Sequence, residues 1–177
     1  MTTTFTGTAG RDTLVANTDS NLVTGGAGDD DLILSQGDTT LVFDRGFGSD
    51  VLTFNNQTYA NSTTGSLDSY QIKFGPGLSA SDLQVRYEDN ALGYGYATLV
   101  LSFANSSDRL SINLPPAWQN DIASPYLPVV IEFDDGTVLT QQDLYDRALL
   151  AVQTGTFLHA ISTDSQIGRA SCRERVS

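Results

Sequence analysis

The sequence has little of the chemistry on which most enzyme active sites depend. It contains one histidine, His159, and one cysteine, Cys172, both near the end of the 177 residues. A Ser-His-Asp triad in a folded core and a zinc cluster of His and Cys are therefore not expected. No P-loop or dinucleotide-binding fingerprint is present. The carboxylates Asp134 and Asp135 precede a glycine, which predicts a turn. We predict that the chain is not an enzyme.

Positive charge and long hydrophobic runs are also scarce. The chain has 9 Lys and Arg against 21 Asp and Glu, a formal charge of -12. Such a chain is not expected to bind nucleic acid or an anionic membrane surface, and it repels itself unless cations neutralise it. Acidity that serves solubility alone is the simpler alternative. No apolar run is long enough to span a bilayer, so no transmembrane segment is expected.

The two ends of the chain give limited information on targeting. The start, MTTTFTGTAG, lacks the basic and apolar regions of a cleaved signal peptide. This leaves three alternatives: a cytoplasmic protein, export by a route that does not read an N-terminal signal, or a start inside a longer parent. At the other end, the run IGRASCRERV resembles the in-frame translation of a sequencing adapter. We treat residues 167–177 as a non-native tail, so Cys172 carries no information on redox compartment.

Glycine and aspartate recur in the first third with a period of nine residues. The segment GTAGRDTLV, residues 7–15, matches GGAGDDDLI, residues 25–33, at an offset of 18 residues. The intervening ANTDSNLVT keeps an amide, Asn21, at the aspartate position, and LSQGDTTLV has Thr39 there. The segment RGFGSDVLT, residues 45–53, restores the pattern two residues late. Each segment keeps an apolar residue near its end: Leu14, Val23, Leu32, Leu41 and Leu52.

These nonamers resemble the glycine- and aspartate-rich repeat of the RTX (haemolysin-type) family, G-G-x-G-x-D-x-U-x, where U is a large apolar residue. The resemblance implies a short parallel β-roll in which residues 18 apart stack on one edge. It also implies secretion from a bacterium in one step through a narrow channel. The five apolar residues are then expected to form the core of the roll.

The residue types of the repeat suit calcium. Glycines allow positive φ and expose carbonyl oxygens, aspartate adds charge, and calcium takes about six to eight oxygen ligands in flexible geometry. We predict Asp12 and Asp30 as side-chain ligands of one site. The carbonyls expected beside them are those of Gly7, Ala9, Gly25, Gly26, Ala27 and Gly28. The two-residue slip weakens the case for a second site, which would use Gly46, Gly48 and Asp50. Asp19, Asn21, Asp38 and Thr39 offer little at the opposite edge.

After residue 69 the glycine and aspartate period stops, and the style of the sequence changes. YQIKF, LQVRY, ATLVLSF and RLSINL alternate apolar and polar residues, which predicts half-buried antiparallel strands. VVIEFDDGTVLT predicts a hairpin that turns at Asp135-Gly136. Thr140 with Asp143 predicts a helix start. The segments RGFGSDVLTF, IKFGPGLSASDLQVRY and IEFDDGTVLTQQDL resemble the haemolysin-type calcium-binding-related domain, which commonly follows RTX repeats.

We therefore expect a mainly all-β chain with four parts. Residues 5–54 form the calcium-binding β-roll, and residues 55–151 form an antiparallel β-domain with one C-terminal helix that caps it. Residues 152–166 begin a further segment or a linker, and residues 167–177 are the tail. Further repeat units of a larger parent are a partner that the sequence leaves open.

Three functions remain in competition. The first is a secreted or surface module that folds when calcium binds outside the cell. The second is an adhesion module in which calcium stiffens a scaffold and the β-domain binds glycan or protein, with Tyr94 and Tyr96 as a candidate surface. The third is a fragment of an enzyme whose catalytic domain lies elsewhere in the parent.

Overall fold

Two six-stranded sheets face each other over most of the chain. The structure is a computed structural model, and it describes residues 1–35, 37–55, 69–89, 97–114 and 129–153. The sheets contain β1 (Thr3–Thr6), β2 (Thr13–Ala16), β3 (Ser20–Thr24), β4 (Asp31–Leu34), β5 (Asp38–Phe43), β6 (Ser49–Phe54), β7 (Tyr70–Phe74), β8 (Leu83–Asp89), β9 (Ala97–Phe103), β10 (Arg109–Asn113), β11 (Val129–Phe133) and β12 (Val138–Leu139). The helix α2 (Gln141–Gln153) follows.

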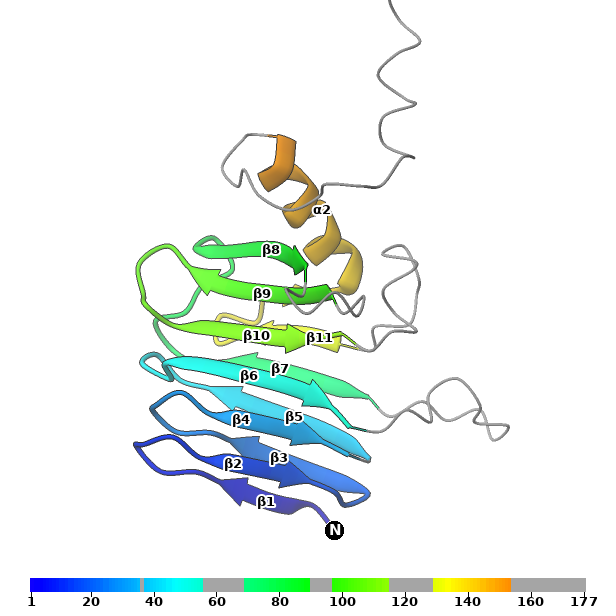
Figure 1. Ribbon diagram of the computed structural model, residues 1–177. Coiled ribbons are helices and arrows are strands. Elements are labelled where there is room, and N and C mark those ends of the chain that lie inside the picture. Colours follow the sequence, from blue (N-terminus) through cyan, green and yellow to red (C-terminus); the bar gives the residue numbers. More distant parts are fainter. Residues whose placement is uncertain (36, 56–68, 90–96, 115–128, 154–177) are drawn as a thin grey trace, which may run out of the picture.

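The chain alternates between the two sheets, as Figure 1 shows. One sheet has the order β1-β3-β5-β7-β11-β12, and the other has β2-β4-β6-β10-β9-β8. Because each crossing returns the chain in the same direction, the strands of the first coils pair in parallel. The prediction of a parallel β-roll is confirmed.

The core lies between the sheets and follows the period of the repeat. Val23, Leu32, Leu41 and Leu52 are fully buried, whereas Leu14, in an end strand of the roll, is partly buried. The predicted apolar stack is therefore present. Strand side chains alternate between the interior and the outer face, as in the burial pattern of β5 and β6, because successive residues point to opposite faces.

The second half extends the same two sheets. β7 pairs in parallel with β5 and β11, and β10 pairs in parallel with β6. The prediction of antiparallel strands is wrong for β7, whose two neighbours are both parallel, and for the pairing of β10 with β6, because alternation reports burial and does not specify the neighbour. It is confirmed for the pairs β8–β9 and β9–β10, and for the β11–β12 hairpin. The hairpin turns at Gly136, with φ of 80°.

The helix lies over the upper end of the stack in Figure 1. Leu144 and Ala148 of α2 are buried in the core, and Arg147 Nη1 donates to the carbonyl of Ala80 at 2.7 Å. The helix α2 starts with the predicted capping box. Thr140 N–H donates to Asp143 Oδ2 at 2.7 Å, and Asp143 N–H donates to Thr140 Oγ1 at 3.4 Å.

Candidate metal centre

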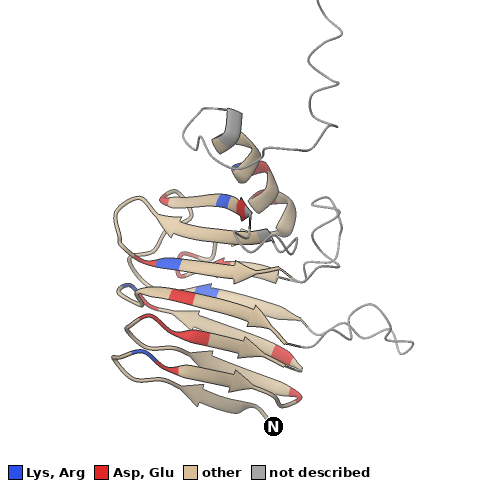
Figure 2. Ribbon diagram, viewed as in Figure 1, with Lys and Arg blue, Asp and Glu red and all other residues tan. Residues whose placement is uncertain are grey.

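Three glycine-containing turns are stacked along one edge of the roll. Residues 7–12 join β1 to β2, residues 25–30 join β3 to β4, and residues 44–48 join β5 to β6. Figure 2 shows acidic residues on this left-hand edge, where the strands of the β2–β4–β6 sheet begin. The turns contact one another through bare backbone. A Cβ on Gly26, where φ is 100°, would stand 1.9 Å from the Thr8 carbonyl oxygen of the turn below.

The aspartates of the three turns form a ladder. Asp30 Oδ1 accepts the backbone N–H of Asp12 at 2.8 Å, and Asp50 Oδ1 accepts the backbone N–H of Asp30 at 2.9 Å. The pairing of Asp31 with Val51 absorbs the two-residue slip, so Asp50 stacks on Asp30 as Asp30 stacks on Asp12. The structure thus brings together Asp12, Asp30 and Asp50, including the residue that the slip had made doubtful.

The second oxygens of the two upper aspartates have no partner. Among the described residues, the buried side-chain polar atoms without a hydrogen bond are Asp30 Oδ2 and Asp50 Oδ2. Asp30 is 1% exposed and Asp50 is 0% exposed. A buried carboxylate oxygen without a donor is costly, on the order of a few kcal/mol. Each such oxygen therefore marks a place where a positively charged ligand would stabilise the fold.

Gly25 leaves the space in front of these two oxygens open. A Cβ on Gly25 would stand 2.5 Å from Asp30 Oδ2 and 3.4 Å from Asp50 Oδ2. Both oxygens therefore approach one point that any other residue would fill. We call the space between Gly25, Asp30 and Asp50 the cradle.

The electrostatics of the three carboxylates differ. Burial raises the pKa of Asp30, and it raises the pKa of Asp50 to about 7. Hydrogen bonds from the backbone and side chain of Thr8 lower the pKa of Asp12. Asp12 Oδ2 accepts those bonds from Thr8 N–H at 2.6 Å and Thr8 Oγ1 at 2.8 Å. Asp12 is therefore partly satisfied within its own turn, whereas Asp30 and Asp50 are not.

The other residues predicted around Asp12 and Asp30 lie in the first two turns. Gly7 N–H donates to the Thr24 carbonyl at 2.9 Å, and Ala27 N–H donates to the Thr8 carbonyl at 3.2 Å. The carbonyl oxygen of Gly25 points at Gly7, where a Cβ would approach it to 1.9 Å. Ala9 is exposed in the first turn. Gly28, where φ is 126°, lies against the backbone of Gly10.

Gly46 and Gly48 make a different set of contacts. Their N–H groups donate to Asp108, at 2.8 Å to Oδ2 and 3.0 Å to Oδ1. The carbonyl of Gly48 accepts Arg109 N–H at 2.8 Å. The structure therefore places these two glycines beside Asp108 and β10, while Asp50, which follows this turn in β6, faces the cradle.

Asp108 was missed from the sequence. Burial acts to raise the pKa of Asp108, but hydrogen bonds from Ser106, Gly46 and Gly48 outweigh it and lower that pKa. The run Asp108-Arg109-Leu110 repeats the spacing of Asp30-Asp31-Leu32. That spacing is the signal that could have identified it, although no glycine-rich turn precedes it.

Among the described residues, the opposite edge has no comparable carboxylates at its buried positions. Asn21 and Thr39 occupy them, 2% exposed each. Asn21 Nδ2 donates to Thr39 Oγ1 at 3.2 Å and to the Thr18 carbonyl at 2.9 Å. The amide of Asn21 and the hydroxyl of Thr39 are thus joined by a hydrogen bond.

The donor set of the cradle fits a hard cation. In the described part of the chain, no group of three or more His, Cys, Asp or Glu side chains could hold a metal ion. A cation here would therefore combine Asp30 Oδ2 and Asp50 Oδ2 with carbonyl oxygens of the same turns. Carboxylates with several carbonyls are the ligands that calcium prefers.

The comparison with protein families agrees with this geometry. Residues 6–41 match the model of the RTX calcium-binding nonapeptide repeat, in four copies. These residues are RTX repeats. RTX repeats bind Ca²⁺, so calcium is the ligand of this part of the chain. The match includes Asp12 and Asp30 and ends before the third turn. A search of curated proteins gave no match.

The helices described here include none that is long and apolar enough to cross a membrane. The predicted surface at Tyr94 and Tyr96 and the segments 154–166 and 167–177 lie outside the described residues.

Proposed function

We propose that the chain is the calcium-dependent folding module of a secreted bacterial protein. In this proposal the RTX repeats stay loose where calcium is scarce and fold when calcium becomes available outside the cell. The observation that carries it is the cradle, where two buried carboxylate oxygens without donors approach one point beside Gly25.

The physical basis is the link between metal binding and folding. Without a cation, the roll must bury Asp30 and Asp50 unpaired and bring a chain of charge -12 into a compact form. A bound calcium ion supplies the missing positive charge and the missing partner of both oxygens. Because the unfolded chain holds no such arrangement, the binding free energy becomes folding free energy. Extracellular calcium modules work at about 0.1–1 mM, which would separate the two compartments.

We assign two positions for calcium within this function. One is the cradle between the second and third turns. The other lies between the first and second turns, with Asp12 and Asp30 as side-chain ligands. The cradle is the stronger, because Asp12 Oδ2 already accepts two hydrogen bonds from Thr8.

The lower end of the roll supports further repeat units as partners. β1 and β2 are the end strands of the two sheets, and Val15 of β2 is 41% exposed. An open strand edge is a template for another coil. Preceding repeats of a larger parent protein would continue both sheets and cover Leu14.

A second candidate is a calcium-stiffened adhesion module. It is favoured by a groove of about 470 Å³ on the β1–β3–β5–β7 sheet, lined by hydroxyl, amide and charged groups that include Gln71 and Lys73, together with the apolar Leu22 and Val42. Such groups suit a glycan or a polar protein surface. Neither candidate involves catalysis by this chain.

The test is a calcium titration of the full chain, starting in chelating buffer and followed by far-UV circular dichroism. Calcium should produce a cooperative gain of β signal, and magnesium should not. The Asp30→Asn/Asp50→Asn variant should lose the response. A wild-type chain whose spectrum and calorimetric signal do not change with calcium would contradict the proposal. Specific binding of the calcium-loaded chain to glycans on an array would favour the adhesion module.

A further inference from the structure

The slip places two extra residues between Thr39 and Asp50, and the third turn makes contacts that the two turns below it lack. Phe47 of this turn enters the core, 2% exposed, with its ring 4.9 Å from that of Phe43. Gly46 and Gly48 direct N–H groups to the next layer, where Asp108 accepts both. The upper side of this turn therefore presents donors to a carboxylate.

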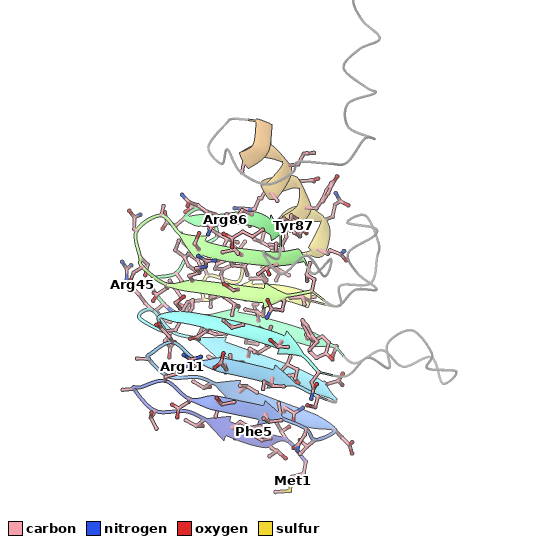
Figure 3. All side chains as sticks on the ribbon, in the orientation of Figure 1. Met1, Phe5, Arg11, Arg45, Arg86 and Tyr87 are labelled. Carbon is pink, nitrogen blue, oxygen red and sulfur yellow. The ribbon has the colours of Figure 1, made fainter. Side chains whose placement is uncertain are left out.

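Arg45 lies in the same turn and reaches two later turns of the same edge. Its Nη1 donates to the Gly77 carbonyl at 3.0 Å, and its Nη2 donates to the Asn105 carbonyl at 2.5 Å. Figure 3 shows Arg45 on the left-hand edge, above Arg11. A guanidinium is always charged and offers five donors in a fixed plane, so it can bridge carbonyl oxygens from separate turns.

Asp108 is as buried as the aspartates of the cradle, but its oxygens are satisfied. It is 1% exposed, and both oxygens accept hydrogen bonds: Oδ1 from Gly48 N–H, and Oδ2 from Gly46 N–H and Ser106 Oγ. In the cradle, by contrast, Asp30 and Asp50 each leave one oxygen without a donor. On this edge, Asp30 and Asp50 therefore lack donors that a cation could replace. Asp108, one layer higher, already has donors for both of its oxygens.

We propose that the guanidinium of Arg45 takes the place of a calcium ion at the upper end of the ladder formed by Asp12, Asp30 and Asp50. Its guanidinium bridges carbonyl oxygens of stacked turns, as calcium does between the lower turns, and Asp108 accepts the N–H groups of the third turn. The cation sites therefore end at Asp50, and the layers formed by β7, β9 and β10 hold together without metal. Arg45 is a positioning residue, since it fixes the turn that leads into β6 and Asp50. The inference rests on the proposed calcium sites of the lower turns.

The test is hydrogen exchange of the full chain, measured by mass spectrometry in chelating buffer and again with calcium. In the wild type, amides of β10 and β7 should be protected in both buffers, and amides of β2 and β4 only with calcium. Arg45→Ala should remove protection from β10 in chelator and lower Tm by about 2–6 °C, the loss expected for two exposed charge-assisted hydrogen bonds. Arg45→Lys keeps the charge without the planar fork and should restore part of the protection.

The matched control is Arg11→Ala. Arg11 lies in the first turn of the same edge, its side chain is 72% exposed, and it pairs with Asp31 at 2.8 Å. This variant should leave β10 exchange unchanged in chelator. Equal β10 exchange in Arg45→Ala and Arg11→Ala would overturn the inference, as would unprotected β10 amides in the wild type without calcium. Failure of the proposed function has a different readout, because it would leave β2 and β4 exchange insensitive to calcium in the wild type.

Discussion

Asp50 Oδ1 accepts the backbone N–H of Asp30 at 2.9 Å, while Oδ2 of each residue has no partner. One oxygen of Asp50 thus joins successive coils of the roll, and the other faces the cradle. In the proposed function, this division lets a single aspartate per turn fix the register of the stack and bind an ion between two turns. The predictions below test that dual role.

Asp50→Asn should change stability with opposite signs in the two buffers. In chelator the variant should be at least as stable as the wild type, because the cradle then buries one fewer unpaired charge. With calcium it should be less stable, and the titration midpoint should rise about 10-fold or more, which corresponds to ~1.4 kcal/mol. Urea unfolding in each buffer measures both effects. Asp31→Asn, at a half-buried neighbouring position that pairs with Arg11, should show no such reversal.

Gly25→Ala should abolish binding in the cradle, because its Cβ would stand 2.5 Å from Asp30 Oδ2. Gly10→Ala is the matched control in the turn below, where the nearest contact to a Cβ is Thr8 Oγ1 at 3.9 Å. Neither glycine has positive φ, so backbone strain does not distinguish the pair. Calorimetric calcium titration should show a lost site only for Gly25→Ala. Equal binding by both variants would show that the cradle is not the site.

Asn21→Asp should destabilise the roll without creating a strong site. The new carboxylate would lose the donors that Asn21 Nδ2 gives to Thr18 and Thr39, and its oxygen would face the Thr18 carbonyl. In saturating calcium, where the roll is folded, we expect a loss of about 1–3 kcal/mol in urea unfolding. A variant as stable as the wild type in calcium would contradict the assignment of the aspartate ladder to one edge of the roll.

The capping box of α2 should contribute stability that depends on pH. Hydrogen bonds from the side chain and backbone of Thr140 lower the pKa of Asp143 from its ordinary 3.8. Because the folded-state pKa is the lower one, the contribution is present above the unfolded value and is lost as pH falls through the folded value. The Tm difference between the wild type and Asp143→Asn, measured in chelator, should therefore be constant near neutral pH and shrink below about pH 4.

Thr140→Ala tests the other half of the box. It should cost about 1 kcal/mol and lower Tm by roughly 2–4 °C at neutral pH. The calcium midpoint should not move, because α2 packs at the far end of the stack from the cradle (Figure 1). A shifted midpoint would show that the helix and the repeats are coupled.

The sequence by itself determined the repeat and its consequences. A period of nine with glycine, aspartate and an apolar residue at fixed places resembles the RTX repeat, and that resemblance implied a parallel roll with an inward stack that includes Leu32 and Leu52. The same period indicated Asp12, Asp30 and Asp50 as the candidate carboxylates. The β11–β12 hairpin and the start of α2 were also readable, because turn and cap chemistry involves residues close in sequence.

The tertiary structure alone decided how distant segments meet. It absorbed the slip so that Asp50 stacks on Asp30, and it joined β7, β10 and β11 to the roll in parallel. It also placed Asp108 against Gly46 and Gly48, about sixty residues earlier in the chain. Local patterns record which face of a strand is buried, but a strand's neighbour depends on where the chain returns after each crossing. Which carboxylate lacks a partner depends in turn on that neighbour.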